Sequence, residues 1–243
     1  MAETEDGYAA AWEGFWRDTK PGRGEAAWDS APEEAAALHV PLFADLLAAG
    51  GGDGLPWVDL GCGNGTQSRY LARRFGRVVG IDLSPTAIEH ARSETPDGEV
   101  DFRVRSALDR DGIRALHEEL GDANVYLRGI LHQSRPQDRP AVAEAVAVLV
   151  GRRGLAFDVE MAAAAKPEIQ RYATAAGGAL PKFAALMQHG LTPADAPDEA
   201  FPALFREAGL TVLRVGDTPL HSTQATPAGA QVVLPMRYLV ARR

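Results

Sequence analysis

The sequence predicts an α/β protein built on a doubly wound sheet. Apolar runs with strand character alternate with helical patterns along most of the 243 residues, which is the alternation that a doubly wound sheet requires. Residues 57–84 read as a strand, a glycine-rich turn, a helix and a second strand. The length and the 46% hydrophobic content allow a single domain with a sizeable core.

The glycine-rich turn is the most informative part of this first unit. A buried strand is expected to end at residues 58–60, and Gly61, Gly63 and Gly65 follow it. Larger side chains at these positions would keep a ligand away from the backbone. The next helix is expected at residues 66–75 and stops at a glycine. The turn therefore predicts a ligand that lies against the backbone between strand and helix.

The acids on either side of this turn indicate the kind of ligand. Asp59 precedes the glycines, and Asp82 ends the second strand near the separation at which an acid meets a ribose in nucleotide-binding units. A dinucleotide fingerprint would need its third glycine at the position of Thr66, and a carboxylate at Asp59 would repel a pyrophosphate. The pattern predicts an adenosine-containing cofactor with a positive charge.

The remaining core elements follow in order. Ser84 and Pro85 form an N-cap and first turn for a helix that runs to about Arg92. A helix with an apolar stripe precedes the fifth strand, and another helix, near residues 198–208, precedes the sixth. Further strands are expected at residues 100–104, 124–128, 154–160, 211–215 and 232–241.

Two segments lie outside this core pattern. Residues 1–52 contain an expected helix, a Pro-Gly turn and a second helix with Pro41 inside it, and residues 161–197 follow the fifth strand. Both are placed to cover the carboxyl ends of the strands, where ligands of such sheets bind. We therefore expect one domain, residues 1–243, made of a helical cap (1–52), a cofactor-binding core (53–160), a substrate lid (161–197) and a C-terminal core (198–243).

Aromatic and histidine side chains in these two segments are candidate ligand contacts. For any one of them packing is the commoner role, but as a set at least one is expected to touch a ligand. We expect Trp28 to contact the cofactor, and Trp16, Tyr172 and His189 to contact the substrate.

Residues 57–84 resemble motif I of the class I S-adenosylmethionine (SAM) dependent methyltransferases, because the strand, the acid, the three glycines, the helix and the second acid fall in register. The resemblance implies a Rossmann-like sheet of seven strands in the order 3-2-1-4-5-7-6, with the last strand antiparallel. It also implies SAM as the cofactor and S-adenosylhomocysteine (SAH) as its product.

The same resemblance assigns the cofactor contacts. Asp82 matches the acid that binds both ribose hydroxyls, and Ser106 and Ala107 stand where many relatives have an Asp that accepts from the adenine. Ser106 can still accept one hydrogen bond, the Ala107 backbone can face the ring edge, and Asp109 is a second acid nearby. The methionine moiety is expected against Asp59, Gly61, Cys62, Gly63, Gly65 and Thr66, and the adenine or ribose beside Leu83.

Residues 124–133 resemble the fourth strand and following loop of small-molecule methyltransferases. Arg128 would then lie beside the methionine tail, and His132 near the cofactor methyl. The His132 imidazole could take a proton near neutral pH, although a histidine that only fixes the loop is the alternative. His189 and His221 are rival bases. Methyl transfer from a sulfonium is an in-line displacement that positioning can drive, so a dedicated base is optional.

Composition narrows the function classes. The net charge of −8 disfavours a nucleic-acid-binding surface. The sequence has no apolar run long enough for a membrane span, and its acidic start is unlike a secretory signal. We therefore expect a cytoplasmic protein without nucleic-acid or membrane partners. Cys62 is the only cysteine, which excludes an internal disulfide and a multi-cysteine zinc site, and packing is its expected role. We predict no metal site and leave the oligomeric state open.

These observations predict a methyltransferase that acts on a small organic molecule, such as a biosynthetic intermediate. The identity of that molecule and its acceptor atom, O, N, S or C, stay open. Two alternatives also stay open. One is a SAM-binding enzyme of the same fold that catalyses a cyclisation, decarboxylation or hydrolysis, and the other is a non-catalytic nucleotide-binding domain.

Overall fold

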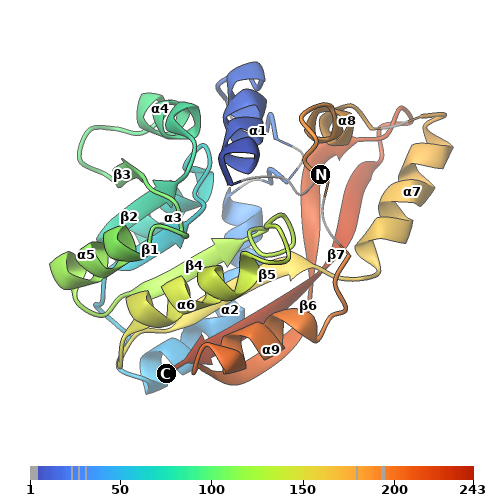
Figure 1. Cartoon of the computed structure of the whole chain (residues 1–243). Coiled ribbons are helices and arrows are strands. Elements are labelled where there is room, and N and C mark those ends of the chain that lie inside the picture. The colour runs from blue at the N-terminus through green and yellow to red at the C-terminus, as the bar shows by residue number, and fades with distance from the viewer. Residues whose placement is uncertain (1–4, 23, 27, 31, 179, 193–194) are drawn as a thin grey trace.

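One mixed sheet runs through the centre of the computed structural model, which describes residues 5–243 except 23, 27, 31, 179 and 193–194 (Figure 1). Within these residues the sheet has 7 strands in the order β3-β2-β1-β4-β5-β7-β6. β1 to β5 are parallel, and β7 is antiparallel to both of its neighbours. The predicted order and the antiparallel last strand are confirmed. The strands are β1 (Trp57–Leu60), β2 (Val78–Asp82), β3 (Asp101–Val104), β4 (Asn124–Arg128), β5 (Ala156–Met161), β6 (Thr211–Ala225) and β7 (Gln231–Arg242).

Helices cover both faces of this sheet (Figure 1). α5, α6 and α9 pack on one face around the apolar side chains of β1, β2 and β4, whereas α2 and α3 pack on the other. No helix in the described part of the chain is long and apolar enough to cross a membrane. The helices are α1 (Glu5–Asp18), α2 (Pro32–Ala49), α3 (Thr66–Phe75), α4 (Pro85–Ser93), α5 (Arg110–Leu120), α6 (Arg139–Val150), α7 (Ala165–Ala175), α8 (Pro181–Gln188) and α9 (Ala200–Glu207).

An aromatic layer joins α2 and α3 to the sheet. The Phe43 ring lies 4.8 Å from the Phe157 ring, and Trp57 stacks on Phe75 at 4.9 Å between centroids. Phe43, Phe157 and Trp57 are buried, so each contributes about 1.5–3 kcal/mol of hydrophobic free energy. α2 is therefore fixed to the sheet, although it belongs to the segment expected to form a cap.

The other elements of the two extra segments lie at the carboxyl ends of the parallel strands. Figure 1 shows α1 beside α4, with α8 near it and α7 further along the edge formed by β6 and β7. The division of the domain into cap, core, lid and C-terminal core stays a prediction.

The structure also differs from the sequence predictions. β3 and β5 begin at Asp101 and Ala156, later than expected. α5 was not predicted, although Asp109 caps it by accepting from the Gly112 N–H at 3.0 Å. β6 continues to Ala225 rather than 215 because its polar second half keeps an inward alternation at Thr218, Leu220, Ser222 and Gln224.

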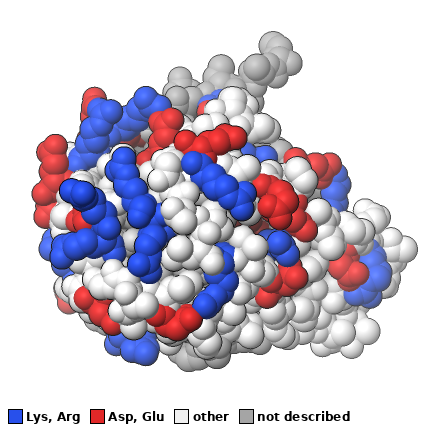
Figure 2. All heavy atoms as spheres, turned by 90° about the horizontal axis from the view of Figure 1, so that it is seen from below, with Lys and Arg blue, Asp and Glu red and all other residues white. Residues whose placement is uncertain are grey.

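The underside of the molecule carries mixed charges. Figure 2 shows many Lys and Arg side chains on one part of this face, with Asp and Glu side chains among and beside them. Exposed ion pairs join β3 to α5 through Arg103 and Glu119, at 2.6 Å, and α5 to α6 through Arg110 and Glu144. Acidic neighbours therefore compensate a part of the exposed positive charge, and each such pair adds little to stability.

Candidate functional site

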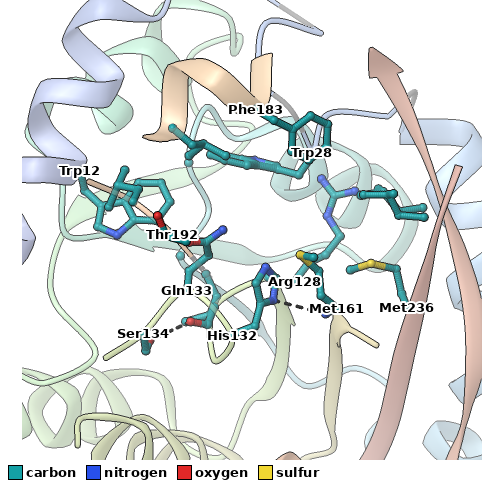
Figure 3. A pocket seen from close by; sticks show the side chains of 18 of the residues that line it. Trp12, Trp28, Arg128, His132, Gln133, Ser134, Met161, Phe183, Thr192 and Met236 are labelled. Atoms are coloured by element: carbon teal, nitrogen blue, oxygen red, sulfur yellow. Dashed lines mark hydrogen bonds between the residues drawn. The ribbon is translucent and has the colours of Figure 1, made fainter. Parts of the chain in front are cut away.

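A cavity of about 1140 Å³ opens at the carboxyl ends of β1, β2, β4 and β5. Its wall is completed by α1, α7, α8, the second half of β6 and the first half of β7. Ligands of doubly wound sheets bind at this edge, and the volume is large for a single small-molecule pocket. Figure 3 shows part of this wall, with the tryptophans and Phe183 on one side and His132 on the other.

The glycine turn between β1 and α3 forms one end of the cavity. Gly61 and Gly63 have φ values of 70° and 52°, which side chains rarely adopt. A Cβ on Gly61 would lie 2.1 Å from the Ile130 Cδ1, and one on Gly63 would lie 2.8 Å from the Trp16 ring. Backbone, Ile130 and Trp16 therefore meet here at a distance that only glycine permits.

Two buried carboxylates face the cavity beside this turn. Asp82 accepts from the backbone N–H groups of Gly63 and Ser84, each at 2.9 Å. Asp59 accepts from the Ser68 hydroxyl at 2.5 Å. Burial raises the pKa of each acid to about 6, and these hydrogen bonds only partly oppose that rise. Ligand groups that donate hydrogen bonds or carry positive charge would stabilise the ionised acids.

The residues around the turn fit SAM in this respect. Each oxygen of the Asp82 carboxylate accepts a hydrogen bond from a backbone N–H and keeps a lone pair for a ligand hydroxyl. Gln67 Nε2 and Arg105 Nε, on the same end of the cavity, have no hydrogen-bond partner within the described residues. Asp59 supplies negative charge where a cationic group of the cofactor is expected.

His132 lines the cavity and forms a buried pair with Glu160. Glu160, near the end of β5, accepts from the backbone N–H groups of Ile130, Leu131 and His132 at 2.8–2.9 Å, and it also contacts the His132 Nδ1. The Met161 N–H lies 3.3 Å from the same Nδ1. Because an ionised carboxylate can only accept, the Glu160 contact favours the proton on Nδ1 and leaves Nε2 as an acceptor.

The charge of Glu160 is set by its surroundings. Burial alone would raise its pKa, but the His132 imidazole and the backbone donors outweigh burial and hold the pKa below its ordinary value. On the same strand, burial and the neighbouring Glu160 raise the pKa of Asp158 well above its ordinary value. The surroundings therefore favour the ionised form of Glu160 beside His132 and the neutral form of Asp158 on the same strand.

An aromatic roof, made of Trp12, Phe15, Trp16 and Trp28, closes the cavity from the side of α1. Neighbouring rings of this roof lie 5.4–6.0 Å apart, in edge or tilted contact. Such contacts add about 0.5–1.5 kcal/mol per pair beyond burial. The roof therefore packs as one unit over the glycine turn.

Glu13 fastens α1 to the start of α4. Its carboxylate accepts from the hydroxyls of Ser84 and Thr86, both at 2.6 Å, and from the Thr86 N–H at 3.2 Å. Burial would raise the pKa of Glu13, but these hydrogen bonds outweigh it and lower the pKa. Since Ser84 follows Asp82 closely, Glu13 ties the roof to the cofactor end of the cavity.

The structure brings most of the predicted site residues to one cavity. The lining includes His132, Trp16, Trp28, Asp59, Gly61, Cys62, Gly63, Thr66, Asp82, Leu83, Ser106, Ala107 and Arg128. Their roles in catalysis and binding stay predictions. Burial raises the pKa of the Cys62 thiol well above its ordinary value, which favours the packing role.

Three predicted site residues are not among the described residues that line the cavity. A Cβ on Gly65 would meet Phe102 and Ala91, so Gly65 packs against β3 and α4. The Tyr172 hydroxyl accepts from the Val233 N–H at 3.4 Å, and His189 lies 3.1 Å from the Asp18 carboxylate. Both rings are thus engaged with neighbouring elements.

The remaining candidates also have places in the fold. His221 lies on β6, within hydrogen-bonding distance of Gln231. Asp109 accepts from the Gly112 N–H as the N-cap of α5, and it is not among the described residues of the cavity wall. Across the described chain no group of three His, Cys, Asp or Glu side chains is placed to hold a metal ion.

Several residues of the site were missed from the sequence. Glu160 had a usable signal, because the strand expected at residues 154–160 carries two acids, Asp158 and Glu160, among apolar residues, and an acid is costly to bury without a partner. Asp29 and Gln133 had no such signal. The β6–β7 contribution was also missed, since β6 was expected to end early. It consists of Leu220, Leu234 and Met236.

Comparison with known proteins places these features in context. Residues 58–152 match a family model described as a methyltransferase domain. The chain is 30% identical over 228 residues to the 2-ketoarginine methyltransferase of Streptomyces arginensis. The matched region covers 90% of this chain and 60% of that protein. It is 31% identical over 100 residues to the dTDP-3-amino-3,4,6-trideoxy-alpha-D-glucopyranose N,N-dimethyltransferase of Streptomyces venezuelae, with 36% of this chain and 42% of that protein covered.

A solved structure is similar over nearly the whole chain. It is a SAM-dependent methyltransferase from Anabaena variabilis, with a TM-score of 0.86, 26% identity, and coverage of 97% of this chain and 94% of that chain. The chain spans less than two thirds of the length of the two Streptomyces relatives.

Proposed function

Because the chain belongs to the class I SAM-dependent methyltransferases, we propose that it transfers a methyl group from SAM to a small organic molecule bound beside His132. The observation that carries the proposal is one cavity lined both by the glycine turn with Asp82 and by His132, which Glu160 contacts from behind the lining. The cofactor and the methyl acceptor can therefore bind side by side in the same cavity.

The glycine end of the cavity is proposed to hold the cofactor. When bound there, SAM supplies a methyl group on a positively charged sulfur that is displaced by in-line attack. Asp82 would accept from the ribose hydroxyls, and Asp59 with the Gly61–Gly63 backbone would face the methionine moiety. Ser106 and Ala107 would lie beside the adenine, as the cavity lining allows.

His132 is proposed to take the proton that the acceptor loses. As the acceptor atom takes the methyl carbon that the cofactor would supply and the bond from that carbon to sulfur breaks, the acceptor proton would pass to Nε2 of His132. Glu160 holds the Nδ1 proton and stabilises the imidazolium that results. The aromatic roof excludes water from this step.

The substrate is proposed to be a small molecule. The two Streptomyces relatives are named for methylation of 2-ketoarginine and of a nucleotide-linked amino sugar, and the cavity of about 1140 Å³ has room beyond a cofactor. A cytoplasmic location and the absence of nucleic-acid and membrane partners stay predictions from the sequence.

The first test is calorimetric titration of the protein with SAM, SAH and NADH. We expect micromolar binding of SAM and SAH and none of NADH. Binding of NADH alone, or of no ligand, would contradict the proposal and favour a non-catalytic or nucleotide-binding domain.

The second test follows labelled methyl groups through a panel of small molecules. We expect SAH to accumulate in step with a labelled product. SAM consumption without SAH would instead point to a cyclisation, decarboxylation or hydrolysis on the same fold.

A further inference from the structure

We propose that the substrate is an organic acid with an apolar body, and that Arg128 binds its carboxylate. This inference rests on the proposed function, since it concerns the half of the same cavity that lies beyond the glycine turn. Arg128 ends β4, and Figure 3 shows its side chain pointing into the cavity, near Trp28 and Phe183.

Arg128 has unused hydrogen-bonding capacity. A guanidinium carries five N–H donors, and in the described part of the chain its one hydrogen bond goes from Nη1 to the Ser30 hydroxyl, at 3.1 Å. Asp29 lies on the same cavity wall, but its carboxylate accepts from the Ala26 N–H at 3.0 Å and burial raises its pKa. Arg128 therefore keeps donors and positive charge available for a ligand.

One side of the surroundings of Arg128 is apolar. The wall near it is built from Met161, Phe183, Leu220, Leu234 and Met236. A guanidinium stays charged in such a place, and a partly buried charge is stabilised when an anion with matching geometry pairs with it. An apolar wall around one cation fits a ligand with an apolar body and one acidic group.

The local charge favours a carboxylate over a more highly charged phosphate. The fork of one guanidinium matches the two oxygens of one carboxylate. Lys166, another cation that lines the cavity, already forms an ion pair with Asp195 at 2.8 Å. Asp29 and Asp59 add negative charge near Arg128, so a dianion would be repelled more strongly than a monoanion.

Arg128 and His132 belong to one short stretch of chain and line the same cavity. An acid held at Arg128 therefore extends along the wall that carries His132. The same carboxylate chemistry could come from the methionine tail of the cofactor, as the sequence predicted for Arg128. The experiment separates these two sources.

The test measures binding to the SAH-saturated protein by calorimetry. The probes are 4-methylpentanoate, 3-phenylpropionate and decanoate, each compared with its primary amide, which has the same body without the charge. We expect at least one acid to bind about tenfold or more tightly than its amide. In Arg128→Gln this preference should disappear, whereas SAH affinity should change by less than about threefold.

Lys166→Gln is the matched control. It also removes a cation from the cavity, but the Lys166 ammonium already has an acidic partner, Asp195. It should keep the preference for the acid. The inference is overturned if no acid binds better than its amide, or if Arg128→Gln keeps the preference. It is also overturned if that variant chiefly loses SAH affinity, which would assign Arg128 to the cofactor.

Thermal unfolding of Arg128→Gln, together with retained SAH binding, shows that the variant folds. The outcome is independent of turnover. If SAH itself does not bind to the unaltered protein, the proposed function fails, and the acids are titrated into the protein without SAH to test Arg128 separately.

Discussion

The two ends of the cavity are built in different ways. At the cofactor end, the glycine turn and Asp82 come from residues 57–84, and backbone geometry and buried carboxylates define the surface. At the substrate end, the wall combines α1, the residues around Trp28, α7, α8 and the β6–β7 strands, which are far apart in the chain. The surface of the cofactor end is formed largely by the backbone and acids of one short segment. The surface of the substrate end is formed by side chains that tertiary packing brings together from distant segments. Substrate preference could therefore change without disturbing cofactor binding.

The junction between the two ends offers the most disruptive test. In His132→Asn we expect turnover to fall about 100-fold or more, because the group that accepts the proton is lost. SAH affinity should stay within about threefold, since the glycine end is untouched. Steady-state kinetics and calorimetry measure the two quantities. Unchanged turnover would remove His132 from the catalytic role.

Removing Asp82 should disturb only the cofactor end. In Asp82→Ala we expect SAH affinity to fall about 10- to 100-fold, because hydrogen bonds from the ribose to a buried carboxylate are lost. Asp195→Asn is a control, since Asp195 is a cavity acid that pairs with Lys166. Equal affinity in Asp82→Ala and the unaltered protein, measured by calorimetry, would contradict the ribose assignment.

Acid pH should act on the same end. The pKa of Asp82 and of Asp59 is about 6 in the structure, and ligand donors favour the ionised acids. SAH affinity should therefore be full well above pH 6 and fall as pH decreases through 6, approaching at most about a tenfold loss per pH unit for each acid. Calorimetry from pH 5 to pH 8 tests this.

The contribution of Asp82 to this pH dependence of SAH affinity can be checked with a variant. In Asp82→Asn the slope should be shallower, because only Asp59 still titrates there. A slope identical to that of the unaltered protein would show that Asp82 does not contribute.

The smallest effect is expected at the link between the two ends. In Glu13→Gln the roof loses the charged hydrogen bonds that fix α1 to Ser84 and Thr86. SAH should dissociate about two- to fivefold faster, and the amides of α1 should exchange with solvent faster. Stopped-flow dissociation and hydrogen exchange measure these rates. If neither rate changed, the roof would not depend on Glu13.

Prediction from the sequence succeeded where the signals were local. The bounds of β1, α3 and β2 follow from an apolar run, three glycines and a glycine stop. The strand order followed from the resemblance to a known family, and the structure shows it. Ser84 was predicted as an N-cap, and its hydroxyl accepts from the Ala87 N–H at 3.1 Å.

The substrate end was harder to predict because its contacts depend on tertiary packing. Nothing near Glu160 in the chain announces that it holds His132, which is 28 residues away. The second half of β6 is polar, and only its pairing with β7 makes it a strand. Tyr172 and His189 were predicted as substrate contacts from the sequence alone, and the structure adds contacts that it could not foresee, from Tyr172 to β7 and from His189 to α1.

The placement of the indole rings gives this protein a built-in optical reporter. Of its 4 tryptophans, Trp12, Trp16 and Trp28 line the cavity, whereas Trp57, on β1, is buried against Phe75 of α3. Ligand entry should therefore alter the emission of the first three and leave Trp57 as an internal standard for the folded state. Replacing Trp57 with Phe would leave a fluorescence signal that comes from the cavity alone, with which occupancy can be followed without any label.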